Sequence, residues 1–224
     1  MQKKVFRPEI RDSFERFINS YLNAQKFIDK LEENSEVILF GGAVRDYFEN
    51  SFKKKPRDID LVLYPNEKLC LTELLEDNKY EYKVNKFGGY KIKVDNLNFD
   101  VWSIDNTWAF KENKVDFNQL QDLNKTVFLS IDAVFYNLTT QKLYNDGYAE
   151  VKSEKELDIV LEDNPHPEIN IMRARYFQKK YDLSFTDKLN NYFNKWLDNH
   201  ESKEEAFRTL DLLEVKRYGI LIEA

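Results

Sequence analysis

The sequence predicts an α+β protein in which a mixed antiparallel β-sheet is backed by helices and followed by a small C-terminal helical part. Three observations predict this class. An apolar strand at residues 37–40 runs through a glycine pair into a short helix. Residues 90–102 alternate around an Asp95-Asn96 turn, as hairpins do. Apolar residues recur at helical spacing before the first strand and toward the C-terminus.

The elements follow in order along the chain. Residues 8–34 carry apolar side chains spaced for one or two amphipathic helices that pack on the sheet. After the second strand, which ends at Pro65, residues 67–77 predict a helix. The hairpin comes next, with Phe99 and Val101 on one face of its second arm and Asp100 on the other.

A rigid connector is expected at Asn164-Pro165-His166-Pro167, because a residue before proline avoids the helical conformation. We therefore expect two domains, a head at residues 1–163 and a helical, neck-like domain at residues 164–224. Helices are expected from Glu168, from Thr186 and from Lys203.

The segment from Val37 to Tyr64 contains the residues with the clearest chemistry. Its second strand starts Asp58-Ile59-Asp60, and alternation places both aspartates on one face. Neighbouring carboxylates repel at neutral pH, and a hard divalent cation is the usual ligand that makes the arrangement tolerable.

The glycine pair in this segment predicts a phosphate site. Gly41 and Gly42 let backbone come close to a phosphate, and they open a helix whose free N–H groups favour anions. Arg45 lies one turn into that helix and is expected to add a charge-assisted contact to phosphate. A salt bridge that holds the helix is the alternative role for Arg45.

Together, G-G-A-V-R-D followed by D-I-D-L resembles the signature of the DNA polymerase beta nucleotidyltransferase superfamily, and within it the first motif of class II CCA-adding enzymes and bacterial poly(A) polymerases. The resemblance extends over residues 37–177. It implies a nucleotidyltransferase head that moves a nucleoside monophosphate from a nucleoside triphosphate to an acceptor hydroxyl without a template. An RNA 3′ end is the acceptor that such a likeness suggests.

The resemblance also implies a third metal-binding carboxylate, because superfamily members place one on a strand beside the Asp-x-Asp strand. Asp100 falls there, and with Asp58 and Asp60 it would hold two magnesium ions. A plain exposed strand position is the alternative for Asp100. Asp105 competes for the role, but we expect it to cap the helix that follows.

The C-terminal part of the resemblance is partial. Arg173-Ala174 and Phe177 match the neck helix of these enzymes, which makes Arg173 a candidate nucleotide ligand, with packing or surface pairing as its alternative. The family's Arg-Arg-Asp element is replaced by Thr126-Val127-Phe128, and its Glu-Asp-x-x-Arg element is absent from residues 166–170. Two other functions therefore stay open: the same chemistry on a small-molecule, protein or nucleotide-signal acceptor, and a decayed, nucleotide-binding regulatory module.

Composition limits the partners. The net charge of −6 argues against a broad nucleic-acid-binding surface, so any RNA contact must be local. Candidates for it are Lys53-Lys54-Lys55 and the cluster Arg173, Arg175, Lys179 and Lys180. The single cysteine excludes an internal disulfide, and neither a membrane span nor a signal peptide at residues 1–8 is expected, so the sequence predicts a cytoplasmic protein.

Overall fold

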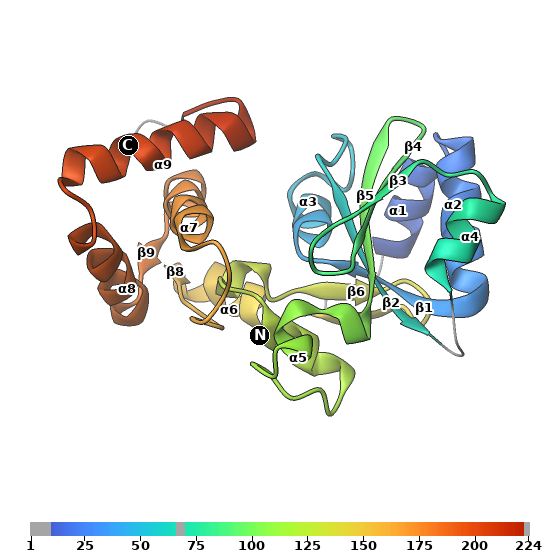
Figure 1. Ribbon diagram of the computed structural model, residues 1–224, viewed down its shortest axis with the longest axis horizontal. Helices are drawn as coiled ribbons and strands as arrows, with labels where there is room; N and C mark the ends of the chain where they lie inside the picture. Colours follow the sequence, from blue (N-terminus) through green and yellow to red (C-terminus); the bar gives the residue numbers. More distant parts are fainter. Residues whose placement is uncertain (1–9, 66–69, 222–224) are drawn as a thin grey trace, which may run out of the picture. The chain divides into compact units, whose positions relative to one another are not determined.

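The computed structural model describes residues 10–65 and 70–221 (Figure 1). The predicted lack of a signal peptide at residues 1–8 and the predicted start of a helix at residue 67 concern residues outside this range. The chain forms two compact units, one made of the residues up to Asn113 with Val134–Tyr144, the other of Lys114–Ala133 with the residues from Asn145 on.

These units do not divide the chain at residue 163. Residues 114–133 and 145–163 belong to the same compact unit as the C-terminal helices, because their contacts are made there. The return of residues 134–144 to the first unit is explained by the sheet, which takes two short strands from that stretch. The head and neck domains expected at 1–163 and 164–224 stay a prediction about domain structure.

The first unit is built on a seven-stranded sheet with the order β3-β4-β5-β2-β1-β6-β7. All described neighbours in this sheet are antiparallel except β2 and β5, which run parallel. The strands are β1 (Ser35–Phe40), β2 (Ile59–Pro65), β3 (Tyr82–Val84), β4 (Tyr90–Val94), β5 (Leu97–Ser103), β6 (Phe135–Asn137) and β7 (Lys142–Tyr144). The predicted mixed sheet is therefore confirmed.

Helices cover one face of this sheet, and the core lies beneath them (Figure 1). The ring of Phe27 on α2 packs edge-on against Phe99 of β5 with 5.3 Å between centroids. Ile59, Leu61 and Val101 point to the same face and are buried. The helices of this unit are α1 (Ile10–Ile18), α2 (Leu22–Asn34), α3 (Gly42–Asn50), α4 (Leu71–Asp77) and the short α5 (Trp108–Lys111), with a 3-10 turn η1 (Ile104–Asn106).

The β4–β5 hairpin forms as predicted and is fixed to a helix. Asp95 and Asn96 both adopt positive φ, 49° and 64°, as a two-residue hairpin turn of this type requires. The Asp95 carboxylate accepts the Asn23 side-chain amide at 2.7 Å, which is the largest cause that lowers its pKa below the ordinary value. The backbone N–H groups of Asn23 and Ala24, at the start of α2, also donate to it and lower the pKa further. The turn thus caps a helix as well as joining two strands.

The second unit is mainly helical. Its elements are the 3-10 turns η2 (Leu120–Thr126) and η3 (Ser130–Asp132), the helices α6 (Asp146–Glu154), α7 (Pro167–Tyr181), α8 (Asp187–Asp198) and α9 (Lys203–Tyr218), and the strand pair β8 (Glu156–Leu157) and β9 (Ser184–Phe185). Ile171 and Met172 of α7, Trp196 of α8 and Leu210 of α9 share one apolar core. The helices expected near residues 168, 186 and 203 are confirmed.

In the described residues we find no helix with the length and apolar character needed to span a membrane. The capping role predicted for Asp105 is wrong, because Asp105 lies within η1 and Thr107 is the residue that precedes α5.

The carboxylate of Asp122 gives the second unit an acid-sensitive contact. It is buried and accepts the Lys125 ammonium at 2.8 Å and the backbone N–H groups of Asn118 and Gln119 at 2.9 and 3.0 Å. These contacts lower the pKa of Asp122 from 3.8 to about 2, with the Lys125 hydrogen bond as the largest cause.

Because the pKa of Asp122 is lower in the folded protein, its contribution to stability is complete above pH 4 and falls as the pH drops toward 2. We expect Asp122→Asn to lower the free energy of unfolding at pH 7 and to reduce its dependence on pH between 4 and 2. Urea unfolding at several pH values measures this. The exposed Asp116→Asn is the matched control, and equal acid dependence in the two variants would contradict the prediction.

Candidate active site

The parallel pairing of β2 and β5 brings two predicted site residues together. Asp60 and Asp100 are direct partners in the register, so their Cα atoms lie about one strand spacing, ~4.8 Å, apart. Asp58 precedes Asp60 by two residues and lies at the same end of the sheet. Since the residues flanking Asp60 and Asp100 are buried under helices, these aspartates lie on the opposite face of the sheet, where both are partly exposed.

The glycine turn lies beside the carboxylates. Phe40, the last residue of β1, is the register partner of Asp60, and Gly41 follows it directly. Gly41 has φ 54° and ψ −109°, a conformation that L residues with a side chain rarely adopt. The turn then delivers the first N–H groups of α3 to this end of the sheet.

The backbone N–H of Gly41, one of the predicted donors to phosphate, already makes a hydrogen bond within the protein. The Gly41 N–H donates to the carbonyl of Val134 at 2.8 Å, so its amide is not oriented toward a ligand. The role of Gly41 in this structure is conformational, whereas the N–H of Gly42 and those of the following residues belong to the first turn of α3.

Arg45 lies over the glycine pair. A Cβ built on Gly42 would lie 3.6 Å from Arg45 Nη2, which places the guanidinium at the start of α3. The residue is largely buried, with 9% of its surface exposed. Its position above the helix N-terminus suits a contact to a phosphate held there.

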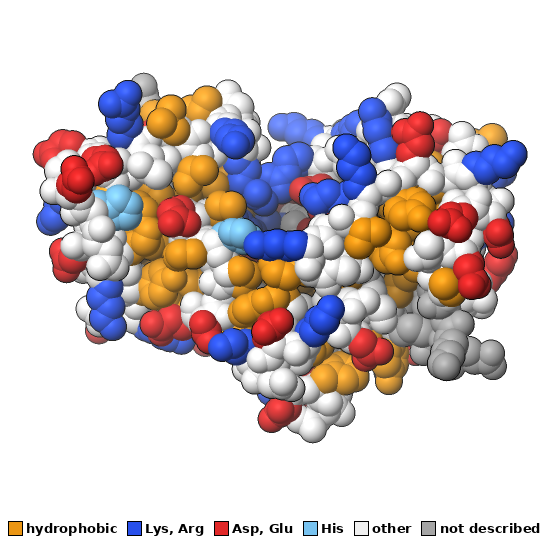
Figure 2. Space-filling model, in the orientation of Figure 1, with side chains coloured by type: hydrophobic (Ala, Val, Ile, Leu, Met, Phe, Trp, Pro, Cys, Tyr) orange, Lys and Arg blue, Asp and Glu red, His pale blue; other side chains and the backbone are white. Residues whose placement is uncertain are grey.

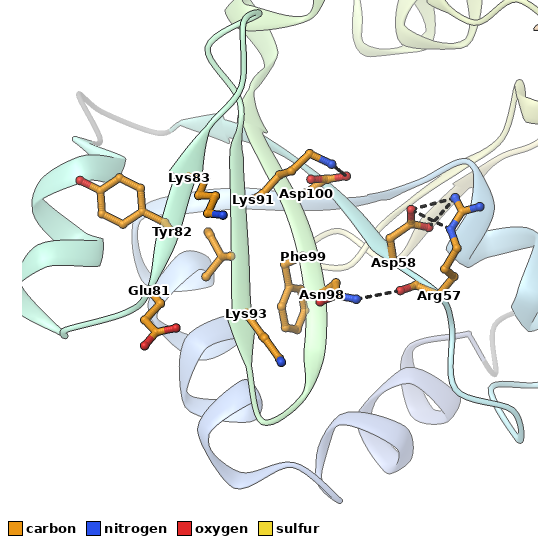
Figure 3. Close-up of a pocket in the computed structure, with 11 residues that line it drawn as sticks. Arg57, Asp58, Glu81, Tyr82, Lys83, Lys91, Lys93, Asn98, Phe99 and Asp100 are labelled. Atoms are coloured by element: carbon orange, nitrogen blue, oxygen red, sulfur yellow. Dashed lines mark hydrogen bonds and ion pairs between the residues drawn. The ribbon is translucent and has the colours of Figure 1, made fainter. Parts of the chain in front are cut away.

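Asp58 and Asp100 are each paired with a cation, as Figure 3 shows. Asp58 accepts two hydrogen bonds from Arg57 Nη2 and one from Nε, the shortest at 2.8 Å. Asp100 accepts Lys91 Nζ at 3.3 Å across the β4–β5 pair. The side chains of Asp58 and Asp100 stay 34% and 25% exposed, so both pairs are open to solvent and to competing cations.

A hollow of about 450 Å³ adjoins Asp58 and Asp100. Its lining is strongly charged, with four cationic and three acidic side chains. They are Arg57, Lys83, Lys91 and Lys93, with Asp58, Glu81 and Asp100. A space of this size and polarity suits a phosphorylated ligand.

The three predicted metal ligands do not form a preassembled metal centre. In residues 10–65 and 70–221, no three carboxylate, histidine or cysteine side chains converge as a metal site. The donor chemistry nevertheless fits magnesium, because carboxylate oxygens are its preferred protein ligands and Asp60 and Asp100 are adjacent in register. Arg57 and Lys91 compensate the charge that a divalent ion would otherwise neutralise.

Arg173 has an ion-pair partner that the sequence reasoning did not identify. Within the second unit, its Nη2 lies 2.7 Å from Oδ2 of Asp132, whose side chain is only 6% exposed. The alternative role of Arg173, packing and pairing, is therefore what the structure shows. A nucleotide contact from Arg173 stays a prediction.

Two aromatic residues near the carboxylates were also missed. Phe40 and Trp102 meet edge-on with ring centroids 6.2 Å apart, and Trp102 lies two residues after Asp100 on the same strand. The period of two along β5 is the sequence signal that would have placed Trp102 on the carboxylate face. The pair supplies apolar surface on the face that carries Asp60 and Asp100.

Solved structures with a similar fold include tRNA-processing enzymes and a tRNA nucleotidyltransferase. A structure titled a tRNA-processing enzyme in apo form I matches 94% of this chain and 54% of its own at 16% identity and a TM-score of 0.56. A tRNA nucleotidyltransferase complexed with a primer tRNA and an incoming ATP analogue matches 82% of this chain and 57% of its own, at 17% identity and a TM-score of 0.53.

A Thermotoga maritima CCA-adding enzyme complexed with tRNA matches 92% of this chain and 50% of its own, at 15% identity and a TM-score of 0.53. This chain thus spans about half of the length of these structures. At such identities the likeness establishes the fold alone, and this confirms the predicted fold class. No protein-family model and no curated protein sequence matches the chain significantly.

The two glycines allow a matched test of the turn. We expect Gly41→Ala to lower the free energy of unfolding by about 1–2 kcal/mol, because alanine is strained at this φ and ψ. Gly42→Ala should cost little, since its Cβ would meet Arg45 at an ordinary 3.6 Å. Urea unfolding of both variants measures the difference, and equal stabilities would contradict the strained-turn interpretation.

The Arg173–Asp132 pair predicts a stability defect. Arg173→Ala leaves a buried carboxylate without its cation and should cost about 3 kcal/mol of unfolding free energy. Combining it with Asp132→Asn removes that charge and should recover part of the loss. A double-mutant cycle in urea measures the coupling. An Arg173→Ala variant as stable as the unmodified protein would show that the pair has no structural role.

Proposed function

We propose that the protein is a metal-dependent, template-independent nucleotidyltransferase that moves a nucleoside monophosphate from a nucleoside triphosphate to the hydroxyl of an RNA 3′ end. One observation carries the proposal. Asp60 and Asp100 are register partners on one face of the sheet, next to the glycine turn that opens α3. Similar structures include complexes with CTP, with tRNA and an ATP analogue, and with tRNA alone, which agrees with this substrate class.

Each part of the site has a defined task in this reaction. The first turn of α3 and Arg45 hold the triphosphate through N–H groups and a guanidinium. Asp58, Asp60 and Asp100 would hold two magnesium ions. When bound there, the ions would supply Lewis-acid chemistry, lowering the pKa of the acceptor hydroxyl and offsetting charge on the pyrophosphate.

The transfer itself is a substitution at the α-phosphorus. The acceptor oxygen forms the new P–O bond, the bond from the α-phosphorus to the bridging oxygen breaks, and pyrophosphate leaves. The acceptor proton passes to water or to one of the carboxylates. Positioning by the fixed β2–β5 register is the main contribution of the protein, because in-line attack depends on geometry.

Two observations favour a competing function, that of a nucleotide-binding module without turnover. Asp58 and Asp100 are paired with Arg57 and Lys91, and the described residues contain no preassembled metal centre. The same chemistry on a small-molecule or protein acceptor is favoured only by the acidic net charge of −6. Turnover and acceptor choice separate these functions.

The deciding experiment measures pyrophosphate release and label transfer from each nucleoside triphosphate, with magnesium, to a short RNA, to small hydroxyl compounds and to the protein itself. We expect transfer to RNA, and Asp60→Asn or Asp100→Asn should lower its rate about 10³-fold, because each removes several kcal/mol of charge stabilisation. The exposed Asp105→Asn is the matched control and should retain activity. Nucleotide binding without turnover on any acceptor would establish the binding-module alternative.

A further inference from the structure

A second hollow lies outside the candidate active site, within the first unit. It has a volume of about 530 Å³ and opens between the C-terminal part of α1 and the loop that follows α3. Its charged lining residues are Arg16, Lys53 and Lys55, all exposed, and none of the nine residues that line it is an aspartate or glutamate. Figure 2 shows lysine and arginine side chains gathered over the end of the sheet near this loop.

The hollow also has an aromatic wall. Phe17 stacks on Phe52 with ring centroids 5.8 Å apart, and Phe17 meets Tyr21 at 5.4 Å. Phe17 and Tyr21 are only partly buried, so ring surface stays accessible next to the cations. Cationic groups beside stacking surfaces are what single-stranded nucleic acid requires, because phosphates and bases alternate along it.

The loop that supplies the lysines is held in a fixed, unfavourable conformation. Ser51 and Phe52 have φ values of 53° and 58°, a region that non-glycine residues rarely occupy. The buried Phe52 ring holds the loop in place, packing against Phe14 at 5.7 Å and against Tyr47 at 5.9 Å. The lysines therefore extend from an anchored base, which lowers the entropy lost when they bind a ligand.

Offsetting the negative ends of nearby helices would account for only part of the positive charge in this hollow. α1 ends at Ile18 and α3 at Asn50, and each helix C-terminus carries the equivalent of about −0.5 charge that nearby cations offset. Three full positive charges face these two half charges, so the hollow stays positive. Of the three, Arg16 donates to the Ser13 hydroxyl at 2.9 Å and Lys55 donates to the backbone carbonyl of Asn96. Both acceptors are neutral, so they orient these cations without neutralising them.

The same loop leads directly to the candidate active site. Lys55 precedes Asp58 by three residues, which span at most about 11 Å. Arg57, between them, is the cation that pairs with Asp58. The backbone at the Lys55 end of the hollow therefore lies within about 11 Å of the backbone at Asp58.

We propose that this hollow binds a nucleotide unit of the single-stranded RNA acceptor, upstream of its reacting 3′ end, with backbone phosphate at Arg16, Lys53 and Lys55 and a base against Tyr21 and Phe17. The proposal rests on the proposed function for the identity of the acceptor. It explains how a protein with a net charge of −6 holds RNA: through one local basic site instead of a broad surface.

The test measures binding of a fluorescent 12-nucleotide RNA by anisotropy over a range of salt concentrations, without nucleotide or divalent ions. Lys53→Gln with Lys55→Gln should weaken binding at least about tenfold and reduce the slope of log affinity against log salt by about 1.4, since each phosphate contact on a single strand contributes about 0.7. Lys26→Gln with Lys142→Gln, exposed lysines outside the hollow, is the matched control. Equal binding by the two double variants would overturn the proposal.

The aromatic wall has its own test. Tyr21→Ala should weaken RNA binding about tenfold through loss of stacking, whereas Tyr21→Phe keeps the ring and should bind as before. Binding of AMP is measured on the same variants. If the Lys53→Gln, Lys55→Gln double variant loses AMP binding but binds RNA as before, the RNA assignment is overturned in favour of a small phosphate ligand.

Failure of this proposal is distinguishable from failure of the proposed function. RNA binding that depends on the hollow supports the inference even where no nucleotidyl transfer is found. Transfer that depends on Asp60, combined with RNA binding indifferent to Lys53 and Lys55, leaves the function standing and removes this site.

Discussion

The site depends on the pairing between β2 and β5, the one parallel pair in the described sheet. Parallel strands cannot be joined by a tight turn, so the chain between them must leave the sheet and return. Here the return passes through α4 and the β4–β5 hairpin, and it places Asp100 beside Asp60. A shift of one residue in this register would turn Asp100 into the core and Phe99 out of it, so burial of Phe99 and Val101 fixes the position of the acid.

The ion pairs of Asp58 with Arg57 and of Asp100 with Lys91 are weak enough for a divalent ion to replace them. Side by side, the aspartates repel, and Arg57 and Lys91 reduce that repulsion in the protein alone. Exposed pairs of this kind contribute at most about 1 kcal/mol, so a divalent ion can displace them at small cost.

Sequence reasoning predicted those features that local pattern determines. Alternation around Asp95-Asn96 gave the hairpin, and the Asp-x-Asp spacing with the glycine pair predicted the acidic face and the helix that opens beside it. It did not predict contacts between distant residues. The Arg173–Asp132 pair joins positions 41 residues apart, and the Gly41–Val134 hydrogen bond depends on how β6 approaches β1. The grouping of residues 114–133 with the C-terminal helices is likewise a product of tertiary contacts, which no local period encodes.

The turn at Asp95 has a consequence for how this fold tolerates change. Its carboxylate holds the first N–H groups of α2, so the hairpin cannot slip along β2 without uncapping that helix. Slippage is therefore opposed at the loop tip, far from Asp100, as well as in the core. Substitutions should be tolerated more easily on the outer strand β3, whose described side chains are mostly exposed. At the turn, a one-residue insertion would shift β5 and move Asp100 out of register with Asp60.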